Sequence, residues 1–308
     1  MNIIEINHLT KRYGDHVAVD DISLNIEKNE VLGLLGPNGA GKTTTMNIIT
    51  GFISATSGTV TIDGADILQD PIRAKKCIGY LPEIPPLYKD MTVWEYLSFV
   101  FRLKKCLSNQ RQHLEEICQK TGLLDVSHRL IGNLSKGYQQ RTGIAQALVG
   151  NPSILILDEP TVGLDPAQII EIRELIRELG REHTVILSTH ILSEAQLVCD
   201  KIVMIYNGKL VSQNLTHNLG KGRTYRAEIL GEPQAILSAL SSLGPEGTIR
   251  SIGKNQFIIE QSTEIDLREE LFYILAKERF PLVGMCEESI SLEQVFMNVL
   301  LQNKRSDE

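Results

Sequence analysis

The sequence contains no run of about 18 consecutive apolar residues, which is the length a helix needs to cross a bilayer. With a mean hydropathy of −0.05 over 308 residues, the chain has the composition of a globular protein. The N-terminal residues also lack a basic segment followed by an apolar one, the pattern of a secretory leader. We therefore expect the chain to stay in the cytoplasm.

Cysteine is scarce and scattered. The chain has 5 cysteines, and no two of them are spaced as Cys-x-x-Cys. An odd number without paired spacing argues against a disulfide framework and against a zinc cluster. We interpret them as reduced cytosolic thiols; they are Cys77, Cys106, Cys118, Cys199 and Cys286.

The chain also lacks an excess of basic residues. Its 31 Lys and Arg are outnumbered by 38 Asp and Glu, so its formal net charge is −7. Proteins that bind nucleic acid over a broad surface usually carry the opposite balance. We therefore expect no nucleic-acid partner.

The apolar residues that are present follow two patterns. Residues 17–26 alternate apolar with polar positions, which predicts half-buried β-strands near the N-terminus. Residues 31–35, 154–157 and 184–187 are continuous apolar runs, typical of strands buried on both faces. Helical spacing is found at 93–103 and 168–181, and an Asn-Gly turn at 207–208 predicts a hairpin over 201–211.

A polar stretch at 212–221 interrupts these patterns, and we place a domain boundary there. Residues 223–308 then restart with a strand (225–230), a helix (233–243), a hairpin (248–260), a helix (266–278), a short strand and a terminal helix. This order predicts a small α+β domain. The residues expected to form its core are Ile229, Leu237, Leu240, Ile258, Leu271, Leu275, Val295 and Phe296.

The strongest motif follows the first continuous run. Gly36 to Thr43 reads Gly-x-x-x-x-Gly-Lys-Thr, between a predicted strand and a predicted helix at 44–50. Glycines allow backbone N–H groups to surround a phosphate, and the helix N-terminus adds its dipole. Lys42 can contact the β- and γ-phosphates, and the Thr43 hydroxyl can bind Mg²⁺. A glycine-rich turn that binds nothing is the alternative interpretation.

Two acids follow the second continuous run. Asp158 and Glu159 end a predicted buried strand, where ligands of open α/β sheets bind. Asp158 suits a Mg²⁺ shell, and Glu159 suits a general base that activates water. Taken alone, an apolar run that ends in two acids is equally typical of an ordinary strand end.

With these motifs in place, residues 1–215 resemble the ATP-binding cassette (ABC) family of ATPases. Tyr13 matches the aromatic residue that stacks on adenine in that family. The segment 134–138, Leu-Ser-Lys-Gly-Tyr, matches the family signature, and 163–165, Gly-Leu-Asp, matches its D-loop. His190, after the third run, matches the switch histidine.

The resemblance implies an α/β fold: a RecA-like P-loop NTPase core with an antiparallel β subdomain and a helical subdomain at about 85–150. The predicted domains are thus 1–215, the ATPase, and 223–308, an accessory α+β domain. ATP and Mg²⁺ are the implied cofactors. The implied catalytic residues are Glu159, His190 and Lys42, and the implied metal ligands are Thr43, Asp158 and Glu83. The implied nucleotide-binding residues are Tyr13, Gly36, Pro37, Asn38, Gly39, Ala40, Gly41, Lys42, Thr43, Thr44, Ser135, Gly137 and Asp165.

Two motifs depart from the family pattern. Glu83 stands where the family usually has Gln, and the signature has Lys136 and Tyr138 where Gly and Gln are usual. Both departures occur in a branch of drug-resistance and gliding-motility exporters, which the chain resembles most. The segment 291–296 also resembles a motif near the end of that branch.

The resemblance further implies a homodimer, with each ATP between the phosphate loop of one copy and the signature of the other. A separate transmembrane permease would carry the substrate, with the chain bound to the inner face of the membrane. We expect an apolar patch at 84–88 and Trp94 to dock it. The alternatives are a non-transport cassette ATPase acting on ribosomes or nucleic acid, and a module that binds ATP without turnover. The second would be expected to lack Glu159 or His190.

Overall fold

We analysed a computed structural model of the chain, which describes residues 2–213, 224–240, 247–261 and 267–288. The chain divides into two compact units, Met1–Gln213 and Asn214–Glu308. The predicted boundaries at 215 and 223, and the segment 291–296, lie outside the described residues. No helix in the described part of the chain is long and apolar enough to span a membrane.

A six-stranded sheet forms the centre of the first unit. Its order is β10 (Lys209–Gln213), β9 (Lys201–Tyr206), β3 (Val31–Leu35), β8 (Thr184–Thr189), β7 (Ile154–Asp158) and β6 (Ile78–Leu81). All neighbours are parallel except β9 and β10, which form the predicted Asn-Gly hairpin. Every residue of β3, β7 and β8 is buried. The continuous apolar runs therefore did identify strands covered on both faces.

A second sheet of the first unit is antiparallel and has the order β2 (His16–Glu27), β1 (Asn2–Tyr13), β4 (Ser57–Ile62) and β5 (Ala65–Asp66). Its alternating residues point one apolar face inward, as the pattern at 17–26 predicts. These inward residues join those of the central sheet and of α1 (Lys42–Ile49) in one core.

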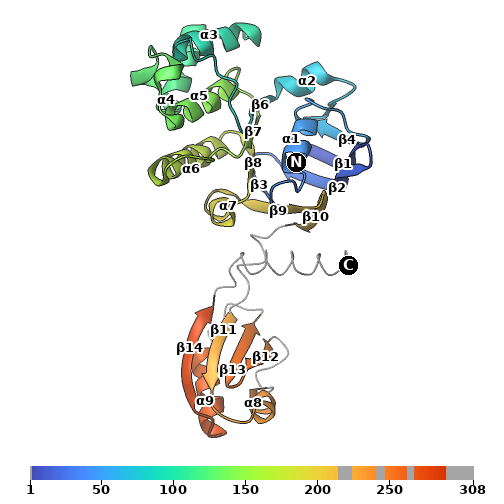
Figure 1. Cartoon of the computed structure of the whole chain (residues 1–308), viewed down its shortest axis with the longest axis vertical. Helices are drawn as coiled ribbons and strands as arrows, with labels where there is room; N and C mark the ends of the chain where they lie inside the picture. The colour runs from blue at the N-terminus through green and yellow to red at the C-terminus, as the bar shows by residue number, and fades with distance from the viewer. Residues whose placement is uncertain (1, 214–223, 241–246, 262–266, 289–308) are drawn as a thin grey trace. The chain divides into compact units, whose positions relative to one another are not determined.

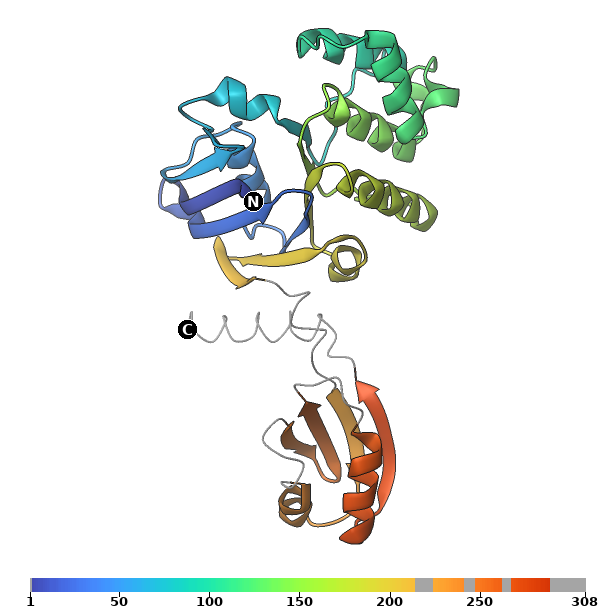
Figure 2. The same ribbon diagram turned by 180° about the vertical axis from the view of Figure 1, so that it is seen from behind.

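The helices of the first unit cover both faces of the central sheet. Helix α1 and the antiparallel sheet lie on one side, and α6 (Pro166–Gly180) and α7 (Leu192–Val198) lie on the other (Figure 1). The view from behind shows the same layers (Figure 2). Helix α6 begins two residues before the predicted start because Asp165 caps it and Pro166 fits its first turn.

Helices gather in the part of the first unit that was predicted to be helical. These are α3 (Val93–Leu103), α4 (Gln110–Lys120), the short 3-10 helices η1 (Leu124–Val126) and η2 (Ile131–Asn133), and α5 (Lys136–Leu148). Thr92 and Glu95 form a capping box at the start of α3. The short helix α2 (Pro71–Lys76) precedes β6. The predicted α/β class, with an antiparallel sheet and a helical region, is confirmed.

The second unit is built on an antiparallel sheet of order β12 (Gly247–Gly253), β13 (Gln256–Gln261), β11 (Thr224–Ile229) and β14 (Leu282–Glu288). Helices α8 (Pro233–Leu240) and α9 (Arg268–Lys277) complete it. Most predicted core residues are buried, but Ile258 and Leu237 are only half-buried, and the neighbours Phe257 and Ile259 are inside instead. Val295 and Phe296 lie outside the described residues.

Candidate active site

The phosphate loop connects β3 to α1 at the carboxyl edge of the central sheet. A Cβ atom on Gly36 would overlap the carbonyl oxygen of Ile205, so a larger residue would push the loop away. Gly41 has a φ of 106°, and a Cβ there would lie 2.5 Å from the Ala18 oxygen. The first turn of α1 therefore starts directly after a glycine and presents unpaired N–H groups, which favour an anion.

Lys42 is buried at the start of α1. Its Nζ donates hydrogen bonds to the carbonyl oxygens of Gly36, at 2.8 Å, and Pro37, at 3.2 Å. It also lies 3.7 Å from Oε1 of Glu159. These contacts hold the ammonium at the site, and a bound phosphate could replace the two carbonyl oxygens as its hydrogen-bond acceptors or be added to them.

Asp158 and Glu159 end strand β7, and both are buried. The hydroxyl of Ser188, on the neighbouring β8, donates to Asp158 Oδ1 and accepts from the Glu159 N–H at 2.9 Å. The Thr43 hydroxyl lies 3.5 Å from the same Asp158 oxygen. Asp158 and Thr43 are therefore brought together from β7 and α1, as a shared metal ligand set requires.

Glu159 adopts a φ of 48°, which is unusual for a residue with a side chain. This turn at the strand end points the carboxylate toward Lys42 and His190. His190 Nδ1 lies 3.0 Å from Glu159 Oε2. Since such backbone strain is often found at functional sites, the geometry agrees with a catalytic role for this carboxylate.

Tyr80, on β6, lies at the edge of this acidic cluster. Burial, and to a smaller extent the Asp158 carboxylate, raises the pKa of the phenol to about 12. The phenol therefore stays neutral and donates a hydrogen bond of 3.2 Å to Asn47 Oδ1 on α1. This contact ties β6 to the helix that follows the phosphate loop.

These groups surround one cavity of about 610 Å³. Most of the predicted site residues line it: Tyr13, Asn38, Gly39, Ala40, Gly41, Lys42, Thr43, Thr44, Glu83, Glu159 and His190. Tyr13 is half exposed, as a ring that stacks on a ligand must be. Gly36, Pro37 and Asp158 lie just outside the lining but contact Lys42 or Thr43. His16, Ala18 and Val162 line the cavity without having been predicted.

The three remaining predicted residues, Ser135, Gly137 and Asp165, do not line this cavity either. Ser135 caps α5 by accepting a 3.4 Å hydrogen bond from the Tyr138 N–H, and Asp165 caps α6. A Cβ on Gly137 would lie 2.7 Å from the side chain of Gln168, so the start of α5 packs closely against α6. Within one chain, the signature and the phosphate loop are thus parts of different surfaces.

The protein alone offers few ligands for a metal ion. In the described ranges, no group of three or more His, Cys, Asp or Glu residues is arranged to hold one. A hydroxyl and one or two carboxylates suit Mg²⁺, which usually keeps water and binds through substrate phosphates. The donor set of Thr43, Asp158 and Glu83 therefore fits a nucleotide-bound Mg²⁺ better than a permanent structural metal.

Two groups that support the acids have no signal in the sequence. Ser188 follows the apolar run at 184–187 and precedes Thr189, and no spacing indicates its role. The second group is Glu194 on α7, which is buried, accepts a 2.6 Å hydrogen bond from Thr161 and lies 3.2 Å from Arg173. This cluster holds the loop that follows Glu159 against α6 and α7.

Replacing Glu194 by Ala should lower the free energy of unfolding by about 3–5 kcal/mol, because it leaves Arg173 without its buried partner. Urea unfolding followed by circular dichroism measures this. The matched control is Glu182→Ala, which breaks the exposed Lys120–Glu182 pair and should cost about 1 kcal/mol or less. Equal losses in the two variants would contradict a supporting role for Glu194.

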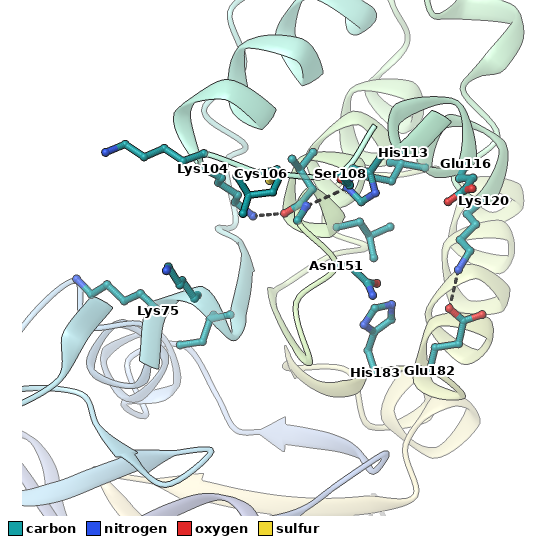
Figure 3. A pocket seen from close by; sticks show the side chains of 18 of the residues that line it. Lys75, Lys104, Cys106, Ser108, His113, Glu116, Lys120, Asn151, Glu182 and His183 are labelled. Carbon is teal, nitrogen blue, oxygen red and sulfur yellow. Dashed lines mark hydrogen bonds and ion pairs between the residues drawn. The ribbon is translucent and has the colours of Figure 1, made fainter. Parts of the chain in front are cut away.

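A larger cavity of about 940 Å³ lies at the opposite edge of the central sheet, between α2, α4 and the end of α5 (Figure 3). Its walls include Ile78, the first residue of β6, and residues that precede β7 and β8, so it lies at the amino ends of these strands. Asp158 and Glu159 lie at the carboxyl end of β7 instead. Lysines outnumber acids in its lining: Lys75, Lys76, Lys104, Lys105 and Lys120 against Glu116 and Glu182. Two apolar residues in this lining, Leu107 and Ile72, are strongly exposed.

Some of these lysines are tied to the walls. Lys104 Nζ donates a hydrogen bond of 2.7 Å to the carbonyl oxygen of Val149 at the end of α5, and burial lowers the pKa of its ammonium. Lys120 pairs with Glu182 at 2.6 Å. His113 Nε2 accepts from the Gly150 N–H at 3.0 Å, and burial lowers the pKa of its imidazole. Figure 3 shows these contacts around the opening.

The chain is similar to known proteins. The family model described as ABC transporter matches residues 19–162. An uncharacterized ABC transporter ATP-binding protein of Bacillus subtilis, YxlF, is 41% identical over 213 residues, covering 68% of this chain and 69% of that protein. The bacitracin transport ATP-binding protein BcrA of Bacillus licheniformis is 38% identical over 213 residues, covering 68% and 69%. The dimeric structure of MJ0796, a bacterial ABC transporter cassette, matches with a TM-score of 0.62 and 28% identity, covering 68% of this chain and 97% of that one.

Proposed function

Because this chain belongs to the ABC transporter family and is an ATP-hydrolysing, ATP-binding subunit of that family, we propose that it energises an exporter through ATP-driven closure of a homodimer. The observation that carries this proposal is the meeting of Lys42, Glu159 and His190 around one cavity, beside the Thr43–Asp158 contact. The export direction is supported by relatives named for bacitracin and lantibiotic transport.

Each residue of the site has a proposed task. Lys42 binds the β- and γ-phosphates, while the loop N–H groups surround them. Thr43, Asp158 and Glu83 hold Mg²⁺, which would neutralise charge on the phosphates. Glu159 accepts a proton from the attacking water, and His190, 3.0 Å from its carboxylate, keeps that carboxylate oriented. Tyr13 stacks on the base.

The signature residues act on the ATP of the partner copy in this proposal. Ser135, Gly137 and Asp165 do not line the cavity of their own chain, which supports a site completed by a second copy. The N–H groups at the capped start of α5 can donate hydrogen bonds to the oxygens of a γ-phosphate. ATP between two such surfaces would favour the closed state, and hydrolysis would reopen it.

We propose that a separate permease docks through short segments at the apolar and basic surfaces of the first unit. The large cavity suits an amphipathic, acidic segment because its exposed Leu107 and Ile72 stand among lysines. In the patch expected at 84–88 and Trp94, Ile84 and Tyr88 are exposed; Trp94 is half-buried, and its ring lies 6.2 Å from that of His128. The chain would thereby sit at the inner face of the membrane.

The second unit has an accessory role in this proposal. All residues that line the ATP cavity belong to the first unit. Its own apolar core, which includes Tyr225, Phe257 and Leu271, supports a separately folded regulatory or dimer-supporting domain.

The experiment starts from the genes that flank the gene of this chain. Any multi-span membrane protein encoded there is co-expressed with the chain, and the two are reconstituted into liposomes. We expect a stable complex whose ATP turnover changes when the membrane protein is present. Export is distinguished from import by the side on which a transported compound must be added. Co-sedimentation with ribosomes and no complex with the membrane protein would favour the non-transport alternative instead.

A further inference from the structure

A third cavity, of about 210 Å³, adjoins the ATP site. It is lined by the segment that follows β6, by the first turn of α5 and by Val162 in the loop after Glu159. Glu83 and Val162 line both this cavity and the ATP cavity. A side chain at Glu83 can therefore turn toward either space.

Opposite charges meet in this third cavity. Glu83 is its acid, and Lys136 and Lys89 are its cations. The Lys136 ammonium lies directly over Gly163, since a Cβ atom built on Gly163 would overlap its Nζ. Because Gly163 follows Val162, this contact keeps the ammonium beside one of the two residues that the cavities share. Lys89 lies in the same segment as Glu83, farther from β6.

A carboxylate at the edge of an ATP site has an electrostatic cost. The triphosphate and the Glu83 side chain are both negative, and their repulsion would weaken nucleotide binding unless a cation offsets it. Glu83 and Lys136 are also two of the three positions at which this chain departs from the pattern of its family, which usually has Gln and Gly there. The structure brings these two departures, with opposite charges, to one cavity.

We propose that Lys136 is a positioning residue that pairs with Glu83 across this cavity, drawing the carboxylate away from the phosphates. This inference rests on the proposed function for its effect on ATP, but the pair itself does not. Among the described residues, no ion pair joins these two side chains; both are exposed, and the proposed pair requires a change of rotamer. The segment after β6 and the signature would thereby move together.

The pair can be tested without nucleotide, by lysine labelling. Because the pair would hold the Lys136 ammonium against the carboxylate and shield it from the reagent, acetic anhydride at fixed pH should label Lys136 about threefold faster in Glu83→Gln than in wild type. Mass spectrometry of tryptic peptides measures the rate. Glu182→Gln is the positive control, because Glu182 pairs with Lys120 at 2.6 Å. A faster rate at Lys89 instead, or no change at Lys136, would overturn the proposal.

A double-mutant cycle tests its effect on ATP. Lys136→Met should raise the KM for ATP about tenfold in the wild-type background but less than twofold in the Glu83→Gln background, because the cation is needed only where the carboxylate is present. Lys136→Arg should restore the wild-type value. Lys89→Met is the matched control and should be neutral in both backgrounds. Equal effects of Lys136→Met in the two backgrounds would overturn the proposed pair. If the wild-type chain showed no ATP turnover, that result would count against the proposed function, and the labelling result alone would decide whether the pair exists.

Discussion

Glu159→Gln should lower steady-state ATP hydrolysis by about 10²–10⁴-fold, the usual contribution of a positioned general base. The amide keeps the shape and size of the carboxylate but cannot accept the proton of water. ATP binding should be retained, because Lys42 and the loop N–H groups are unchanged. Phosphate release under saturating ATP measures the first effect, and equilibrium binding of a labelled ATP measures the second.

The environment of Glu159 makes this prediction specific. The carboxylate is buried, is turned by a φ of 48°, and contacts both Lys42 and His190. Glu182→Gln is the matched control, since that carboxylate is exposed and pairs with Lys120 at the opposite edge of the sheet. Turnover by Glu159→Gln within a few fold of the control would show that another group activates the water.

The second large effect is expected at Lys42. Lys42→Ala removes the buried ammonium that would contact the phosphates, and a lost contact of this kind costs about 2 kcal/mol or more, which is about thirtyfold in Kd. It also leaves Glu159 without the cation 3.7 Å away, which adds repulsion toward ATP. Calorimetric titration with ATP and Mg²⁺ measures the affinity.

The control for Lys42 is Lys277→Ala, an exposed lysine of the second unit. It changes the net charge of the chain by the same amount and should leave the ATP affinity unchanged. Circular dichroism must show that Lys42→Ala is folded. A folded Lys42→Ala that binds ATP as tightly as wild type would place the triphosphate elsewhere.

The central sheet and the phosphate loop could be predicted because their signals are local. Three continuous apolar runs indicated β3, β7 and β8, and the glycine spacing indicated the loop that follows β3. Parallel strands carry their carboxyl ends to one edge, so the residues that follow these strands were expected to meet. The structure brings Lys42, Glu159 and His190 together there.

Other features have no local signal. In the second unit, Phe257, Ile258 and Ile259 are three adjacent apolar residues, and the sequence does not decide which face is buried. The structure buries Phe257 and Ile259. Ser188 accepts a hydrogen bond from the Glu159 N–H because β8 pairs with β7, and Glu194 accepts one from Thr161 because α7 packs beside the loop after Glu159. Such contacts depend on the whole fold. The shared cavity of Glu83 and Lys136 likewise depends on how α5 meets the segment after β6.

The central claim is that two copies of this chain build each ATP site, and the most direct measurement is phosphate release from a mixture of two inactive variants. Lys42→Ala damages the phosphate loop, and Ser135→Arg blocks the signature, so each variant alone should be inactive. A mixed dimer contains one intact pair of surfaces, from the loop of one copy and the signature of the other. We therefore predict that mixing the two inactive proteins restores ATP hydrolysis. No activity in the mixture, with mixed dimers demonstrated by two affinity tags, would contradict the claim.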